Sequence, residues 1–172
     1  MDTSRNKTLL IVWHSRTDTA YQMAQAALQG AEHAAVELEA TQQLNIVMKR
    51  ASDVQPGDLL GADGYIFCAP ENLAALSGEM KEFFDRNYYA VLDQLNGRPY
   101  ALLISAGSDG SMAAKQAERI CTGWRLNPVA PTLIVNTSAQ TPEAILAPKQ
   151  ITPQNARDSH EKGGTVAALL LL

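Results

Sequence analysis

Four short apolar runs, each bounded by polar or turn-forming residues, constrain the fold of this chain more than any other feature. They are Thr8–Trp13, Gly64–Cys68, Tyr100–Ser105 and Thr132–Val135. None of them alternates apolar with polar residues, as a strand with one face in water does. Continuous runs of this kind are typical of parallel strands that are covered on both faces. We therefore predict a buried parallel sheet, with a fifth and weaker strand at Asn45–Lys49.

Helical patterns separate these runs along the chain. One extends from Ala20 to about Gln42, a second follows a capping Ser77, and a third begins near Ser111. Thr152-Pro153 is typical of an N-cap followed by proline at the first position of a helix. Because strands and helices alternate, we predict a single three-layer α/β domain that spans residues 1–172.

The composition sets limits on cofactors and partners. The chain has 172 residues, 46% of them hydrophobic, and a net charge of −4, which is not the basic balance of a nucleic-acid-binding protein. Cys68 and Cys121 form no metal-type pair and predict reduced thiols in the cytoplasm. The polar segment 1–8 is unlike a signal peptide, and the longest apolar run, Val166–Leu172, is shorter than the roughly 20 residues of a membrane span. We expect no metal, no membrane and no nucleic acid.

Three of the predicted loops are candidates for a ligand site, because open parallel sheets bind ligands outside the carboxyl ends of their strands. These loops read HSRTDT, APENLAALSG and SAGSDGSM, and each is rich in small or polar residues. The first places three hydroxyl side chains and Arg16 directly before a helix, which suits a phosphate group. Ordinary helix capping is the alternative explanation for the same hydroxyl residues.

Other nucleotide and phosphate motifs are missing from the sequence. Neither GxxxxGK[ST] nor GxGxxG occurs, which disfavours a P-loop enzyme and a dinucleotide-binding domain. A response regulator would need acidic residues after the first and third strands, where this chain has Trp13-His14 and Cys68-Ala69.

Together the loops and their flanking segments resemble the flavodoxin-like family, in particular small bacterial NAD(P)H-dependent FMN reductases and quinone reductases. The resemblance is carried by HSRTDT at 14–19, GYIFCAPENLAALSGEMKEFFDRNYY at 64–89 and SAGSDGS at 105–111. It implies a flavodoxin-like three-layer sandwich with a five-stranded parallel sheet in the order 2-1-3-4-5. It also implies noncovalent FMN, NAD(P)H as co-substrate and a quinone or similar small molecule as electron acceptor.

The resemblance also implies which residues hold the flavin. The phosphate would be surrounded by Ser15, Arg16, Thr17 and Thr19. The isoalloxazine ring would be lined on one side by Pro70, Glu71, Asn72 and Leu73, and on the other by Ala106, Gly107, Ser108 and Asp109. No catalytic side chain is expected, because the chemistry is centred on the flavin.

The first loop departs from the family pattern at two positions. The usual loop has a glycine and a third hydroxyl residue where this chain has Asp18 and Ala20. Asp18 brings a negative charge and a Cβ atom to a tight turn beside a dianion. A flavodoxin-like binding module that has lost its flavin therefore stays open as an alternative to a reductase. A flavodoxin-type electron carrier is a further alternative, which the mild net charge of −4 and the aromatic content of 6% make less favoured.

Several further residues allow two interpretations. We expect His14 to be structural, bonded to a loop carbonyl, and Glu71 either to oppose an anionic reduced ring or to accept backbone amides. Tyr88-Tyr89 and the tail Val166–Leu172 could pack within the chain or support a homodimer or homotetramer. Cys68, Cys121 and Trp124 are expected in the core.

Overall fold

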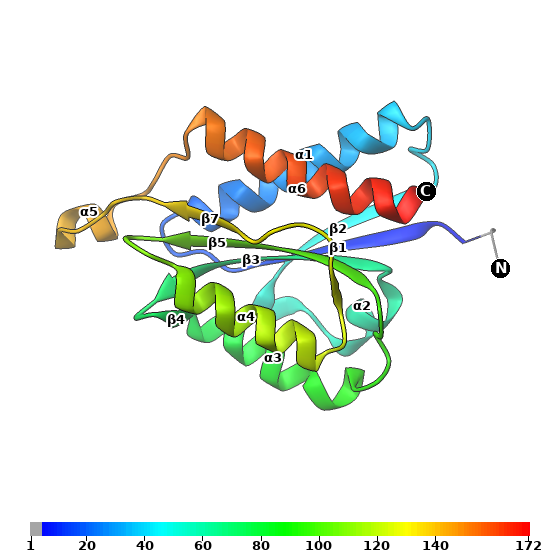
Figure 1. Cartoon of the computed structure of the whole chain (residues 1–172), viewed down its shortest axis with the longest axis horizontal. Helices are drawn as coiled ribbons and strands as arrows, with labels where there is room; N and C mark the ends of the chain where they lie inside the picture. Colours follow the sequence, from blue (N-terminus) through cyan, green and yellow to red (C-terminus); the bar gives the residue numbers. More distant parts are fainter. Residues whose placement is uncertain (1–4) are drawn as a thin grey trace.

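The computed structural model describes residues 5–172, in which a parallel sheet is the central layer (Figure 1). The sheet path is β2-β1-β3-β5-β6. Its members are β2 (Leu44–Arg50), β1 (Lys7–Trp13), β3 (Gly64–Asn72), β5 (Pro99–Ala106) and β6 (Asn127–Pro128). β7 (Leu133–Asn136) also pairs with β5 in parallel, and β4 (Ala75–Leu76) pairs with β3 in antiparallel orientation. The prediction of a parallel α/β sheet is thus confirmed.

The predicted five-stranded sheet in the order 2-1-3-4-5 is wrong, because the described chain forms seven strands and the main path runs β2-β1-β3-β5-β6. β6 and β7 are separate short segments along the same edge of β5; Pro128 is the last residue of β6, and Pro131 lies between the two segments. Proline donates no hydrogen bond, so a continuous edge strand is interrupted there. β4 is a two-residue strand that folds back on the end of β3, and its sequence is too short to give a strand pattern.

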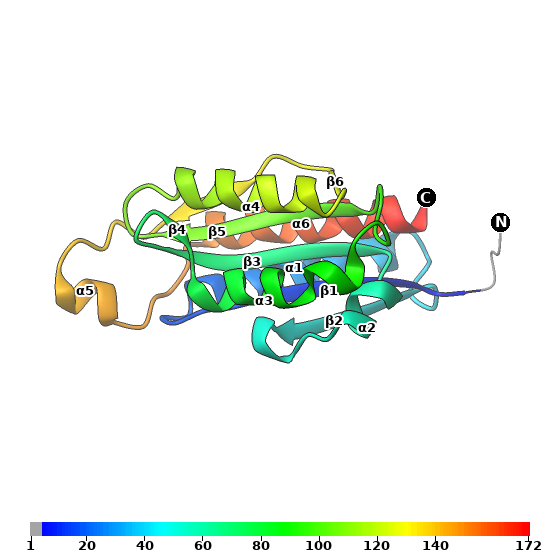
Figure 2. The same ribbon diagram turned by 90° about the horizontal axis from the view of Figure 1, so that it is seen from below.

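Helices cover both faces of the sheet (Figures 1 and 2). One face carries α1 (Thr19–Glu37) and α6 (Pro153–Leu171), which pack against each other along their lengths. The other face carries α2 (Pro56–Gly61), α3 (Gly78–Val91) and α4 (Ser111–Gly123), and a single 3₁₀ turn, η1 (Ala51–Asp53), follows β2.

α1 ends at Glu37, five residues before the predicted end, and Glu39 has a positive φ of 54° just beyond it. Within the described residues, no helix combines the length and apolar character needed to cross a membrane.

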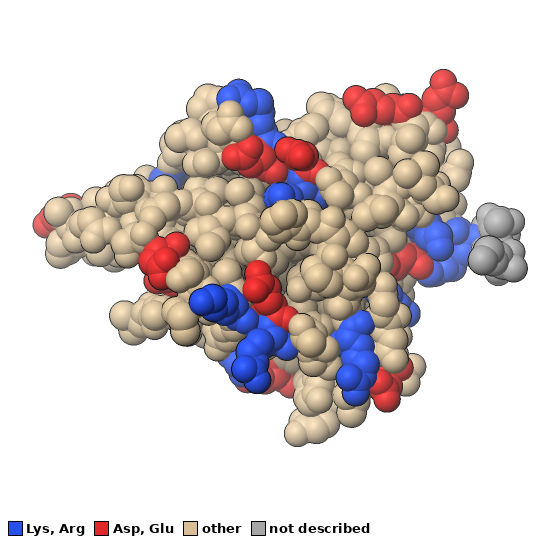
Figure 3. Space-filling model, viewed as in Figure 1, with Lys and Arg blue, Asp and Glu red and all other residues tan. Residues whose placement is uncertain are grey.

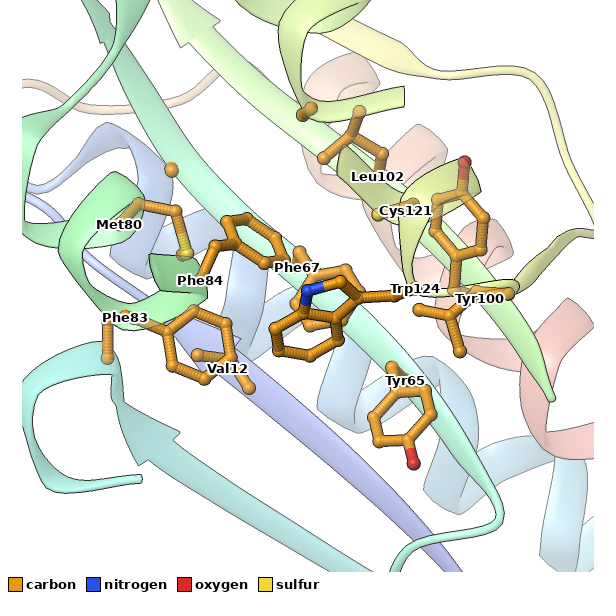
Figure 4. Close-up of a cluster of buried hydrophobic side chains, with 14 of the residues drawn as sticks. Val12, Tyr65, Phe67, Met80, Phe83, Phe84, Tyr100, Leu102, Cys121 and Trp124 are labelled. Carbon is orange, nitrogen blue, oxygen red and sulfur yellow. The ribbon is translucent and has the colours of Figure 1, made fainter. Parts of the chain in front are cut away.

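Two hydrophobic cores form, one on each side of the sheet. On the α3–α4 side, Phe67 of β3 packs against Phe83, Phe84 and Trp124, with ring centroids 5.1–6.5 Å apart (Figure 4). Cys121 lies in the same core, and Cys68 lies in the core beneath α1 and α6. Burial raises the pKa of both thiols well above its usual range, which keeps them protonated and unreactive. The prediction that Cys68, Cys121 and Trp124 are core residues is confirmed.

The contact between α1 and α6 depends on two glycines. A Cβ atom on Gly163 would lie 1.8 Å from the carbonyl oxygen of Ala27, and one on Gly30 would lie 1.8 Å from that of His160. Both distances are far inside van der Waals contact, so the two helix backbones touch directly. Val166 and Ala167 are buried at this side of the sheet, so this part of the tail packs within the chain.

The carboxyl ends of the parallel strands lie together at one end of the molecule. Figures 1 and 2 show the short helix α5 (Pro142–Leu146) projecting at this end, on the connection between β7 and α6. The sequence pattern did not predict α5, which is only five residues long.

Candidate functional site

A cavity of about 730 Å³ lies at the carboxyl ends of the strands, a volume typical of small-molecule sites. The loop after β1, the end of β3 and the loop after β5 all contribute to its wall, as the sequence predicted. Of the twelve predicted cofactor-binding residues, the cavity is lined by Ser15, Arg16, Thr17, Thr19, Pro70, Glu71, Asn72, Ala106 and Gly107. Leu73, Ser108 and Asp109 are not part of the lining.

The first loop presents the start of α1 to this cavity. Asp18 is the N-cap, and within the described chain its side chain makes no capping hydrogen bond. The amides of the first helical turn have no partner inside a helix, so they are left for a ligand or water. Thr19 is 4% exposed and lines the cavity, and its Oγ1 has no hydrogen-bond partner among residues 5–172. A buried hydroxyl without a partner is costly, and a bound acceptor would satisfy it.

Asp18 does not point into the cavity, although the sequence suggested that its charge would lie beside the phosphate. The residue is exposed and lines a neighbouring cleft between α1 and the segment 148–153. Its backbone adopts φ 73°, which is the left-handed region where glycine is the ordinary residue. The tight turn therefore forms despite the Cβ atom, at the cost of some backbone strain.

Replacing Asp18 by glycine is expected to raise the free energy of unfolding by about 1 kcal/mol, because glycine adopts a positive φ without strain. Urea denaturation of the flavin-free protein measures the change. Asp18→Ala is the matched control, since it removes the charge and keeps the Cβ atom. An equal rise in the free energy of unfolding of Asp18→Ala would show that the charge of Asp18, and not its backbone conformation, limits the stability of the protein.

His14 directly follows β1 and is the centre of a hydrogen-bond network that extends from the buried Ser77 to the exposed Arg50. Its Nδ1 lies 2.7 Å from Ser77 Oγ, and its Nε2 lies 3.2 Å from a carboxylate oxygen of Glu79. Arg50 donates two hydrogen bonds to the same carboxylate, at 2.8 and 3.1 Å. Both ring nitrogens thus face protein groups, which agrees with a structural role, but the partners are two side chains and not a loop carbonyl. Ser77 is fully buried, so this Ser–His–Glu arrangement offers no accessible nucleophile.

The stability of the protein is expected to fall with acid pH because of His14. Burial lowers its pKa below 6.5, outweighing the attraction of Glu79, and Arg50 and Arg16 lower it further. At a pH between the two pKa values, His14 is therefore protonated in the unfolded chain and neutral in the folded chain. Between the lowered pKa and 6.5, the free energy of unfolding should drop by up to about 1.4 kcal/mol per pH unit as the pH falls.

Urea denaturation at several pH values between 5 and 8 measures this effect, with His14→Gln as the comparison. The variant should lose part of the pH dependence above pH 5. Glu79, whose pKa is lowered chiefly by the hydrogen bond from Arg50, acts in a separate window at and below 4.5. An unchanged slope in His14→Gln would contradict the assignment.

The end of β3 forms a small hairpin at the cavity wall. Glu71 pairs with Leu76 and Asn72 with Ala75, and Leu73 and Ala74 form the two-residue turn, with φ values of 52° and 63°. Leu73 is fully exposed at the tip of this turn, which explains why it does not reach the cavity. The Oε2 atom of Glu71 is buried and, among the described residues, lacks a hydrogen-bond partner. Glu71 thus adds a second unsatisfied atom to the lining.

The loop after β5 divides into an inner and an outer half. Ala106 and Gly107 face the cavity, and the segment after β7 holds both of them. The N–H of Thr137 donates a 2.8 Å hydrogen bond to the carbonyl of Ala106, and the side chain of Gln140 donates one to the carbonyl of Gly107. In the outer half, Asn136 donates to the carbonyl of Ser108, and Asp109 accepts a 2.6 Å hydrogen bond from Ser111. These last two predicted residues therefore shape the loop from outside.

The cavity also has lining residues that the sequence did not assign to the cofactor. Two of them, His14 and Ser105, lie in segments that the sequence analysis had noted, and the others are Arg50, Glu79, Thr137, Ala139, Ile145, Leu146 and Lys149. Arg50 could have been found, because it is the last residue of β2 and so lies at the same edge of the sheet. Lys149 lies in an irregular segment whose place beside the first loop depends on tertiary contacts, and no local pattern indicates it.

Comparison with known proteins agrees with this geometry. The model of the NADPH-dependent FMN reductase family matches residues 12–140, well over half of the chain. A curated protein named flavodoxin, from Aquifex aeolicus, is 28% identical over 102 residues, which are 59% of this chain and 51% of that protein. The chain therefore spans about half the length of this curated relative.

Solved structures show the same fold at low sequence identity. A flavodoxin from the domain Archaea superposes with a TM-score of 0.76 at 16% identity, covering 96% of this chain and 99% of that chain. A flavodoxin described as WrbA-like, from Agrobacterium tumefaciens, has a TM-score of 0.71 at 13% identity, covering 96% and 98%. The chain has a flavodoxin-like fold and belongs to the NADPH-dependent FMN reductase family.

Proposed function

We propose that this protein binds FMN in the cavity and passes electrons from NAD(P)H through the flavin to a quinone or similar small acceptor. The observation that carries the proposal is the buried, unpartnered hydroxyl of Thr19 at the uncapped start of α1, on the wall of the cavity. A hydroxyl group and free amides at a helix N-terminus donate the hydrogen bonds that the oxygens of a phosphate monoester accept. The family match supports the same ligand.

The residues of the cavity fit the remaining parts of FMN. Ser15, Arg16 and Thr17 add hydroxyl groups and a positive charge next to Thr19, where the phosphate would lie. Pro70–Asn72 and Ala106–Gly107 would line the ring through side-chain and backbone contacts, and Glu71 Oε2 would accept a hydrogen bond from the ligand. When bound, FMN supplies the redox chemistry by accepting a hydride and passing electrons on. The protein binds, orients and shields it.

An absorption spectrum of the purified protein before and after addition of FMN tests binding, and a flavin band that remains with the protein on gel filtration is the expected result. Oxidation of NADH and NADPH in the presence of a benzoquinone then tests the reductase. Bound FMN without turnover of either nicotinamide would exclude the reductase, and failure to bind FMN would favour a binding module that has lost flavin.

A flavodoxin-type electron carrier is the second candidate, favoured by the name of the relative from Aquifex aeolicus. Such carriers usually present a strongly acidic docking face. The mild net charge of −4 and the aromatic content of 6% support the reductase instead. On the one face drawn in Figure 3, acidic and basic side chains are interspersed. A redox titration distinguishes the two: well-separated one-electron steps would favour the carrier, and a single two-electron step the reductase.

The predicted location and assembly remain part of the proposal. The burial of both thiols is compatible with the reducing cytoplasm but does not require it. Of the two segments predicted for a homodimer or homotetramer contact, Tyr89 is 84% exposed and Leu172 is 91% exposed, whereas Tyr88 packs against the core. Light scattering of the purified protein measures the oligomeric state.

A further inference from the structure

The cavity carries a cation that the predicted phosphate loop does not contain. Lys149 lines the cavity together with Ser15, Arg16 and Thr17, although it lies about 130 residues further along the chain. It belongs to residues 147–152, which we call the connector, between α5 and α6. Its backbone N–H donates a 2.8 Å hydrogen bond to the carbonyl of Thr17, so the connector is joined directly to the first loop.

Gln22 of α1 fixes the connector in this place. Its Nε2 donates to the carbonyl of Lys149 at 2.7 Å, and its Oε1 accepts from the N–H of Ile151 at 3.2 Å. The same Nε2 also lies 3.2 Å from the carbonyl of Asp18, the N-cap of the helix. One side-chain amide thus holds the connector against the first turn of α1, which is the turn that faces the cavity.

The ammonium group of Lys149 has capacity for one more acceptor. Its Nζ donates to the backbone carbonyls of Ile145 at 3.0 Å and Ala147 at 2.6 Å, and an ammonium has three donors. Within residues 5–172 it makes no ion pair with a carboxylate. Two neutral carbonyls leave its charge uncompensated at the wall of the cavity.

The charges around the cavity indicate that the ammonium group of Lys149 is suited to bind an anion. Arg50 is paired with Glu79, so Arg16 and Lys149 are the lining cations without a carboxylate partner in the described chain. A phosphate monoester carries between one and two negative charges near pH 7, and Arg16 alone supplies one positive charge. Glu71 is the remaining carboxylate of the lining and would oppose an anion, which increases the need for a second cation.

We propose that Lys149 binds the phosphate group of the flavin cofactor, as a second cation beside Arg16, and that Gln22 positions it. This inference rests on the proposed function, because it assumes that a phosphate-bearing flavin occupies the cavity. The phosphate site would then be built from two distant parts of the chain, the first loop and the connector. The consequence is that Lys149 contributes to affinity for FMN and not for riboflavin, which has the same ring without the phosphate.

The test is a fluorescence titration of the full-length protein with FMN and with riboflavin at low salt. Lys149→Met should weaken FMN binding by about tenfold to a hundredfold, the range expected for one charged hydrogen bond, and leave riboflavin binding unchanged. Lys149→Arg should recover most of the FMN affinity, because it keeps the charge. Lys115→Met, at an exposed position on α4, is the matched control and should bind both flavins like the wild type.

Salt provides a second measurement, because at 1 M ionic strength charges are screened beyond about 3 Å. The difference between wild type and Lys149→Met should therefore shrink. Equal FMN affinities in wild type and Lys149→Met would overturn the inference while the proposed function stands. An equal loss for FMN and riboflavin would also overturn it, since it would show that Lys149 only maintains the connector. Wild type that binds neither flavin would overturn the proposed function and this inference with it.

Discussion

Replacing Gly163 by alanine is expected to lower the free energy of unfolding by about 3 kcal/mol, because the new Cβ atom would lie 1.8 Å from the carbonyl oxygen of Ala27. The obstacle is backbone of α1, which cannot turn aside as a flexible side chain does. α1 and α6 must therefore separate, and the core beneath them, which includes Val166 and Ala167, loses contacts. For a protein of this size, such a loss lowers the melting temperature by about 6–12 °C.

Thermal and urea denaturation measure this effect, with Gly123→Ala as the matched control. Gly123 is the last residue of α4, and a Cβ atom there would meet no other atom within 4 Å. Alanine restricts the unfolded chain more than glycine, so Gly123→Ala should raise stability by about 0.4–1 kcal/mol. The stability of Gly164→Ala should lie between those of Gly163→Ala and Gly123→Ala, because its Cβ atom would make an ordinary contact, 3.4 Å from the carbonyl oxygen of Gly30. Equal stabilities of the three variants would show that α1 and α6 do not depend on close backbone contact.

This crossing illustrates what the sequence could and could not predict. The apolar runs predicted the main strands correctly, because a strand covered on both faces is apolar at nearly every position. The glycines at positions 30 and 163 gave no such signal, since each lies within an ordinary helical pattern. Their role depends on how two helices far apart in the chain meet, and local patterns carry no information about that.

The hairpin at the end of β3 shows the same limit on a smaller scale. Two-residue hairpin turns can usually be recognised in a sequence by Asn-Gly or a similar pair of residues that tolerates positive φ. Here the turn consists of Leu73 and Ala74, which adopt positive φ without being typical turn residues. The sequence therefore indicated a loop along the ligand, and the structure instead has a turn that exposes Leu73 and leaves Glu71 on the cavity wall.

The candidate site was predictable where it follows directly from the sheet. Residues next to the carboxyl ends of β1, β3 and β5 necessarily gather at one edge, so the sequence alone assigns Ser15, Pro70 and Ala106 to one site. Lys149 could not be assigned in this way, because it reaches the site through hydrogen bonds of the connector and not through the end of a strand.

Replacing Thr19 by valine is expected to have opposite effects on stability and on ligand affinity. Its Oγ1 is buried without a partner in the part of the chain that the structure describes. Burying an unsatisfied hydroxyl costs about 1–3 kcal/mol, and valine has nearly the same shape without that cost. Urea denaturation of the flavin-free variant should therefore show a free energy of unfolding about 1 kcal/mol higher than that of the wild type.

The same change should weaken FMN binding by about tenfold to a hundredfold, because the phosphate loses a hydrogen bond to a charged acceptor. Thr19→Ser keeps the hydroxyl and should bind FMN much more tightly than Thr19→Val. Thr122→Val is the control for the substitution itself, since the Thr122 hydroxyl is exposed and donates to the Glu118 carbonyl within α4. A Thr19→Val protein that binds FMN like the wild type would place the phosphate elsewhere. A gain in stability together with a loss of FMN binding would show that the unsatisfied hydroxyl is retained for the ligand, and that the start of α1 is stabilised only when the cavity is filled.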